Sequence, residues 1–90
     1  MMETEIRLLL KDDPALPKLA VLMEEMQAYY RVYSPPRDEI VQSIATRPVG
    51  AEILICENAV SVIGFIAFSG IYPGPGLKPG IFLKELYVAD

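Results

Sequence analysis

The sequence contains no histidine, no tryptophan and only one cysteine, Cys56. A single cysteine excludes an internal disulfide, and without histidine no cysteine/histidine metal cluster can form, so we expect no metal centre. No apolar run approaches the roughly 18–20 residues that a membrane helix requires. The first ten residues carry Glu3, Glu5 and Arg7 instead of an apolar signal core. These absences predict a cytoplasmic protein that does not enter the membrane.

Clusters of basic residues are also missing. Eight basic residues are scattered along the chain against twelve acidic ones, which gives a net charge of −4. This distribution excludes the basic patch of a nucleic-acid-binding protein and fits a cationic small molecule better than an anionic polymer. Hydrophobic residues make up 52% of the chain, which predicts one folded domain over residues 1–90. A domain of this size cannot bury all the apolar surface that such a composition provides, so association with another chain is also expected.

The first half of the sequence predicts a strand and two helices. Residues 5–10 form a short apolar strand, and Asp13-Pro14 is typical of a helix start, with a capping aspartate before a proline. Apolar residues then recur at spacings of three and four, which predicts a helix that ends near Tyr33, before two prolines. A second, shorter helix begins at Arg37-Asp38-Glu39 and ends at Pro48.

The second half predicts three strands. Residues 51–56 and 60–69 are rich in β-branched residues and are joined by a short turn at 57–59, so they form an antiparallel hairpin. The glycine- and proline-rich residues 72–80 predict a loop, and residues 81–88 a last strand. Nearly continuous apolarity favours a sheet that the two helices cover on both faces. The predicted fold class is α/β: a mainly antiparallel sheet of about four strands with two helices, in the order β-α-α-β-β-β.

Two short motifs in the second half resemble a known family. Gly64-Phe65 lies within the second strand of the hairpin, and Leu83-Lys84-Glu85-Leu86-Tyr87-Val88 forms the last strand. Together they resemble the N-terminal half of the GNAT N-acetyltransferase superfamily, and among its members the small-amine and diamine acetyltransferases most closely. Lys84 departs from the diamine enzymes, which tend to carry an acid there.

This resemblance implies the transfer of an acetyl group from acetyl-CoA to a primary amine. In the family, the strand that matches residues 81–88 bulges and splays, and its backbone holds the cofactor. By that pattern Leu86, Tyr87 and Val88 bind acetyl-CoA, and Glu85 is the general base. The acceptor side is lined by four tyrosines, which are Tyr29, Tyr30, Tyr33 and Tyr72.

The same resemblance implies an incomplete enzyme. The glycine-rich loop that binds the cofactor's diphosphate in this family would follow Asp90, so we expect the chain to be inactive alone. The alternative is a non-catalytic GNAT-derived module for association or small-ligand binding, with Glu85 an ordinary strand carboxylate and the tyrosines packing residues. In either case residues 81–88 form an apolar edge strand, which we expect to pair with a second copy or a complementing chain.

Overall fold

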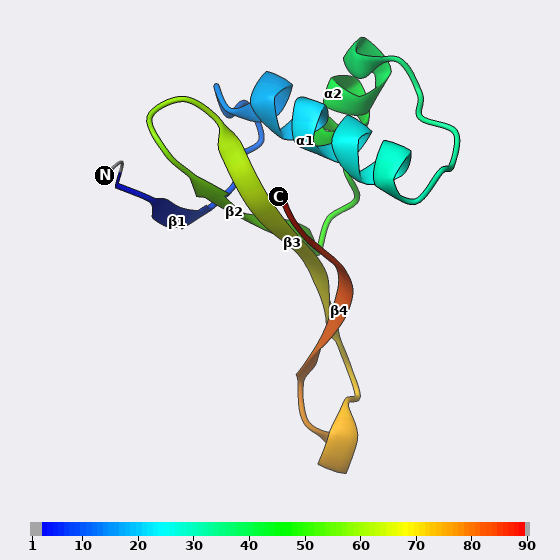
Figure 1. The fold of residues 1–90 in the computed structure, drawn as a ribbon. Coiled ribbons are helices and arrows are strands. Elements are labelled where there is room, and N and C mark those ends of the chain that lie inside the picture. The colour runs from blue at the N-terminus through cyan, green and yellow to red at the C-terminus, as the bar shows by residue number, and fades with distance from the viewer. Residues whose placement is uncertain (1–2, 90) are drawn as a thin grey trace.

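The computed structural model describes residues 3–89 of the chain. Two helices and four strands follow one another in the predicted order, which confirms the α/β architecture (Figure 1). The elements are β1 Glu5–Leu8, α1 Leu16–Tyr29, α2 Arg37–Ala45, β2 Ala51–Glu57, β3 Val62–Ile71, a turn of 3-10 helix η1 Pro75–Leu77, and β4 Gly80–Val88.

The four strands form one antiparallel sheet in the order β1-β2-β3-β4. The turn between β2 and β3 spans residues 58–61, slightly later than the predicted 57–59, and Asn58 stabilises it. The Asn58 side-chain oxygen accepts hydrogen bonds from the backbone N–H groups of Val60 and Ser61, both at 2.8 Å. The hairpin of β3 and β4 extends beyond the helices, with η1 at its far tip (Figure 1). As predicted, β4 lies at an edge of the sheet.

Both helices lie on the same face of the sheet (Figure 1). Ile53, Ile55 and Phe65 of this face join the buried side chains of the helices in one hydrophobic core. On the other face, Ile6 and Leu86 remain 72% and 52% exposed. The prediction that the two helices cover both faces is therefore wrong. Apolar residues on both faces of a strand indicate that both can be buried, but they do not say on which side each helix docks.

The start of α1 differs from the prediction. The helix begins at Leu16 and not at Pro14, because the Asp13 carboxylate accepts hydrogen bonds within the turn before the helix and does not cap the helix itself. This carboxylate accepts hydrogen bonds from the backbone N–H groups of Leu10 (2.9 Å) and Ala15 (3.0 Å). It also accepts two hydrogen bonds from the guanidinium of Arg7 in β1, at 2.6 and 2.8 Å. Asp13 thus links the first strand to the helix entry.

The end of α1 comes four residues before the predicted Tyr33. Arg31 adopts a left-handed backbone conformation with φ of 58°. Its N–H group donates to the carbonyl of Ala28 (3.1 Å), and the N–H of Val32 donates to the carbonyl of Gln27 (3.0 Å). This pair of hydrogen bonds is a Schellman motif, which ends a helix before any proline is reached.

Candidate functional site

Strand β4 contains a bulge at Lys84. Glu85 lies opposite Ala67 of β3, whereas the next residue of β3, Phe68, lies opposite Leu83. Lys84 is therefore an extra residue in β4 with no counterpart in β3. The resemblance to the GNAT superfamily implies such a bulge in this strand. A bulge bends its strand and redirects the neighbouring side chains, and such irregularities are frequent beside active sites.

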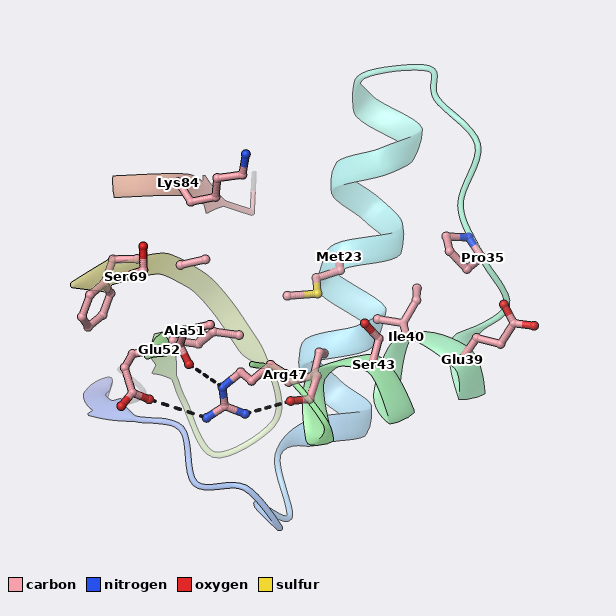
Figure 2. Close-up of a pocket in the computed structure, with 14 residues that line it drawn as sticks. Met23, Pro35, Glu39, Ile40, Ser43, Arg47, Ala51, Glu52, Ser69 and Lys84 are labelled. Atoms are coloured by element: carbon pink, nitrogen blue, oxygen red, sulfur yellow. Dashed lines mark hydrogen bonds and ion pairs between the residues drawn. The ribbon is translucent and has the colours of Figure 1, made fainter. Parts of the chain in front are cut away.

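A cleft of about 520 Å³ lies beside this bulge, between α2 and the sheet (Figure 2). Its floor is apolar, and Glu39, Ser43, Glu52 and Lys84 supply polar groups around it. Lys84 enters from β4, on the side of the cleft opposite α2 (Figure 2). The volume and the mixture of an apolar floor with a few polar groups are typical of small-molecule sites.

Arg47 stabilises one end of the cleft. Its guanidinium donates hydrogen bonds to the backbone carbonyls of Ile44 (2.9 Å) and Ala51 (3.0 Å), and it lies 3.9 Å from the Glu52 carboxylate (Figure 2). It also donates a hydrogen bond to the backbone carbonyl of Leu9 (3.1 Å). These contacts join the end of α2 to β2 and to the segment after β1. Because the carbonyls occupy its donors, Arg47 shapes the cleft and is less suited to bind a ligand.

Glu85, the candidate general base, lies on the helix-covered face of the sheet. Its register partner Ala67 packs against the hydrophobic core, and directly opposite residues share a face. Glu85 is half-buried. Among residues 3–89, no hydrogen bond or ion pair occupies its carboxylate. This carboxylate, next to the bulge, is therefore available to accept a proton or a hydrogen bond from a ligand.

Of the four predicted acceptor-side tyrosines, Tyr29 contacts β4, and Tyr30 packs against Tyr29. The rings of Tyr29 and Tyr30 pack edge to face, with centroids 5.2 Å apart, and Tyr29 contacts Tyr87 at 6.2 Å. The Tyr87 hydroxyl donates a hydrogen bond to Oε2 of Glu25 at 3.0 Å. We refer to Glu25, Tyr29, Tyr30 and Tyr87 as the Glu25 cluster. It joins the second half of α1 to the end of β4.

Sequence reasoning did not single out Glu25. The apolar periodicity of α1 assigns Glu25 to the solvent side of the helix, and that assignment holds. However, Glu25 lies four residues before Tyr29, and residues at this spacing are neighbours on a helix surface. That spacing to a candidate tyrosine is a signal that could have identified it.

The other two tyrosines lie apart from this cluster. Tyr33 is 81% exposed in the segment after α1, and Tyr72 is 77% exposed in the loop after β3. Neither makes a ring contact within residues 3–89. The β3–β4 hairpin carries its loop away from the helices (Figure 1). The structure therefore gathers Tyr29 and Tyr30, but not Tyr33 and Tyr72.

The predicted cofactor residues Leu86, Tyr87 and Val88 form the end of β4. Their side chains alternate: Tyr87 lies on the helix face, opposite Phe65, and Leu86 and Val88 are exposed on the open face. Within the described part of the chain, β3 is the only strand that pairs with β4. In the same part, no group of acidic, cysteine or histidine side chains could hold a metal ion. No helix there is long and apolar enough to cross a membrane.

Comparison with known proteins identifies the fold. No protein-family model and no curated protein matches the sequence. The structure is similar to an integron cassette protein from the mobile metagenome of V. cholerae, with a TM-score of 0.77 and 18% identity over 99% of this chain and 57% of that one. It is similar to the ribosomal-protein-alanine N-acetyltransferase of Brucella melitensis biovar Abortus 2308, with a TM-score of 0.72 and 20% identity over 97% of this chain and 58% of that one.

A third similar structure is an aminoglycoside acetyltransferase from an uncultured soil metagenomic sample, solved in complex with trehalose. Its TM-score is 0.69 at 16% identity, over 96% of this chain and 56% of that one. The chain therefore spans little more than half the length of the proteins it resembles. Over that span it has the fold of GNAT-type acetyltransferases, which confirms the fold resemblance seen in the sequence. At these identities the similarity establishes the fold and not an activity.

Proposed function

We propose that the chain forms the acceptor side and the acetyl-holding strand of an N-acetyltransferase that acts on a primary amine. The observation that carries this proposal is the bulge in β4 at Lys84, at the mouth of the cleft, within a fold that acetyltransferases share. The cleft would take the body of the acceptor, and the exposed edge of β4 would lie along the acetyl donor.

The donor in this proposal is acetyl-CoA, which when bound would supply an activated acetyl thioester. An edge strand suits its extended pantetheine arm, because β4 pairs with only one strand in the described part of the chain. The N–H group of Ala89 donates to Ile63 of β3, so in this antiparallel ladder the N–H groups of Leu86 and Val88 point away from β3, and that of Tyr87 points towards it. The N–H groups of Leu86 and Val88 would bind the arm and the acetyl carbonyl oxygen, and Tyr87 would contact the donor through its other groups. Donors fixed in a strand can stabilise a developing oxyanion without reorganising.

Glu85 would remove a proton from the acceptor's ammonium group, directly or through a water, so that the neutral amine can attack. Its half-buried position beside the bulge supports this role. Among the described residues, no tyrosine lines the cleft itself, so Tyr29, Tyr30, Tyr33 and Tyr72 would contact only those parts of the acceptor that extend beyond it. That these 90 residues alone do not turn over acetyl-CoA stays a prediction.

The donor site can be tested by recording amide shifts during a titration with acetyl-CoA. We expect shifts at residues 84–88, and none with adenosine 3′,5′-bisphosphate, which lacks the pantetheine arm. Glu85→Gln should leave these shifts in place, because the proposed role of Glu85 is to take a proton and not to bind the donor. No shift at millimolar acetyl-CoA, or equal shifts with the nucleotide, would contradict the proposal.

A second candidate function is association, and the open face of the sheet favours it. This face is almost entirely apolar, because β1 and β4 expose apolar side chains on it. A pocket of about 260 Å³ on the same face is lined by residues of all four strands. The edge of β4 continues this face, with Ile81, Phe82 and Leu83 all more than half exposed. Such a surface and edge favour contact with another polypeptide. The partner would be a second copy of the chain or a complementing chain that pairs with residues 81–88.

Light scattering at several protein concentrations tests this association. We expect a mass above that of the monomer, and we expect Leu86→Lys to reduce it because a lysine on the open face is costly to bury. Leu77→Lys is the control, since Leu77 is even more exposed than Leu86, at 78% against 52%, but lies in η1, outside the sheet. A monodisperse monomer at high concentration would exclude a second copy of the chain as the partner.

A further inference from the structure

The Glu25 cluster combines a carboxylate with aromatic rings at one place on the surface. Tyr29 is 67% exposed, and its ring stands nearly perpendicular to that of Tyr30, at 84°. Tyr87 approaches from β4 with an interplanar angle of 60° to Tyr29. The three rings therefore meet edge to face and do not stack face to face into a closed apolar contact.

The Glu25 carboxylate has remaining capacity to accept hydrogen bonds. A carboxylate offers about four lone-pair sites. The Tyr87 hydroxyl uses one of them, on Oε2, and no other donor within residues 3–89 reaches this carboxylate. Its neighbour Glu24 differs, because Arg37 pairs with it at 2.7 Å. Two adjacent glutamates on one helix thus have different partners: Glu24 joins α1 to the start of α2, whereas Glu25 accepts a hydrogen bond from Tyr87 of β4.

We propose that the Glu25 cluster binds the ammonium group of a small organic cation. The carboxylate of Glu25 supplies the charge and the hydrogen-bond acceptor, and the faces of Tyr29 and Tyr30 attract the cation through their ring quadrupoles. The Tyr87 hydroxyl holds the Glu25 side chain at the end of β4. A net charge of −4 on the whole chain further favours a cation over an anion.

We identify this cation as the acceptor amine, and this identification rests on the proposed function. Tyr87 and Glu85 are two residues apart on β4 and therefore share the helix-covered face, roughly 7 Å apart along the strand. Glu25 thus attracts one ammonium group close to the carboxylate that would deprotonate the acceptor. This assigns specificity to Glu25 and proton removal to Glu85, and it favours an acceptor that carries a positive charge over a neutral one.

Ligand binding can be measured without any acetyl donor. The probe is butylammonium, with butanol as the neutral compound of similar shape, and the readout is the tyrosine ring and backbone shifts in a titration. We expect weak binding that shifts residues 25–30 and Tyr87, and no such shift with butanol. Glu25→Gln keeps an acceptor for the Tyr87 hydroxyl but removes the charge, and it should weaken binding about fivefold. Tyr29→Leu should weaken it about threefold.

Glu24→Gln is the matched control, because it removes the same charge from the adjacent residue of the same helix. It should change the affinity for butylammonium little. Equal losses in Glu24→Gln and Glu25→Gln would mean general attraction to an acidic protein and would overturn the inference, as would equal binding of butanol. If butylammonium binds as expected while acetyl-CoA leaves residues 84–88 unaffected, the cation site stands and the proposed acetyl transfer fails.

Discussion

Replacing Asp13 with alanine is expected to lower the free energy of unfolding by about 3 kcal/mol. Asp13 is only 3% exposed and accepts four hydrogen bonds, two from Arg7 and two from backbone N–H groups. Alanine leaves the two N–H groups without this acceptor and leaves Arg7 with only Glu57, at 2.6 Å. A domain of this size has a total stability of roughly 5–13 kcal/mol, so the loss should be a large part of it. Urea denaturation followed by circular dichroism measures it.

The same residue predicts how stability depends on pH. The hydrogen bonds from Arg7 lower the pKa of Asp13 well below its ordinary value; burial opposes this effect, and the N–H groups of Leu10 and Ala15 add to it. A carboxyl group whose pKa is lower in the folded state stabilises the fold above its unfolded pKa of about 4. This contribution is lost as the pH falls below that value towards the folded pKa. The unmodified chain should therefore lose stability more steeply below pH 4 than Asp13→Ala does.

Asp12→Ala serves as the control for both measurements. Asp12 is the neighbouring carboxylate but is exposed, and a surface substitution of this kind should change stability by less than about 0.5 kcal/mol. If Asp13→Ala were as mild as Asp12→Ala, the link between β1 and the start of α1 would not exist in solution.

Replacing Leu19 with alanine is expected to cost about 3 kcal/mol. Leu19 is fully buried, at 0% exposure, in the core that joins α1 to the sheet. The substitution removes apolar contacts and leaves a cavity that a small, tightly packed core cannot fill. Because this core holds α1 on the sheet, Leu19→Ala should also weaken the Tyr29–Tyr87 contact. Chemical denaturation gives the loss of stability, and the tyrosine ring shifts report the contact.

Val21→Ala is the matched control on the same helix. Val21 is 46% exposed, so its shortening should cost well under 1 kcal/mol. A loss below about 1 kcal/mol for Leu19→Ala would indicate that α1 does not dock on the sheet as described.

Much of the secondary structure could be predicted because its causes are local. The β-branched runs predicted β2 and β3, and Asn58 marked the turn between them. The acidic first turn correctly located the start of α2 at Arg37. Boundaries were wrong where a distant or unusual contact decided them. The helix α1 starts later than predicted because Asp13 binds Arg7 in the turn before it. It ends earlier than predicted because Arg31 adopts a left-handed conformation.

The candidate site was predicted in part, for the same reason. The motif around Glu85 identified β4, and the family resemblance implied the bulge that the register reveals at Lys84. Tyr29 and Tyr30 pack against each other, and their adjacent positions in the sequence account for this contact. Glu25 was missed because its partner Tyr87 lies 62 residues further along the chain. No local pattern specifies such a pair.

The sequence by itself determined the order of the elements, the edge position of β4 and the fold that the motifs resemble. Periodicity and turn chemistry depend on residues a few positions apart, so they can be read directly from the chain. Only the tertiary structure decided that both helices dock on one face of the sheet, which leaves the other face apolar and exposed. It also decided that α1 lies close enough to the end of β4 for Glu25 to meet Tyr87. Both outcomes depend on how whole layers pack, because a strand with two apolar faces can receive a helix on either side.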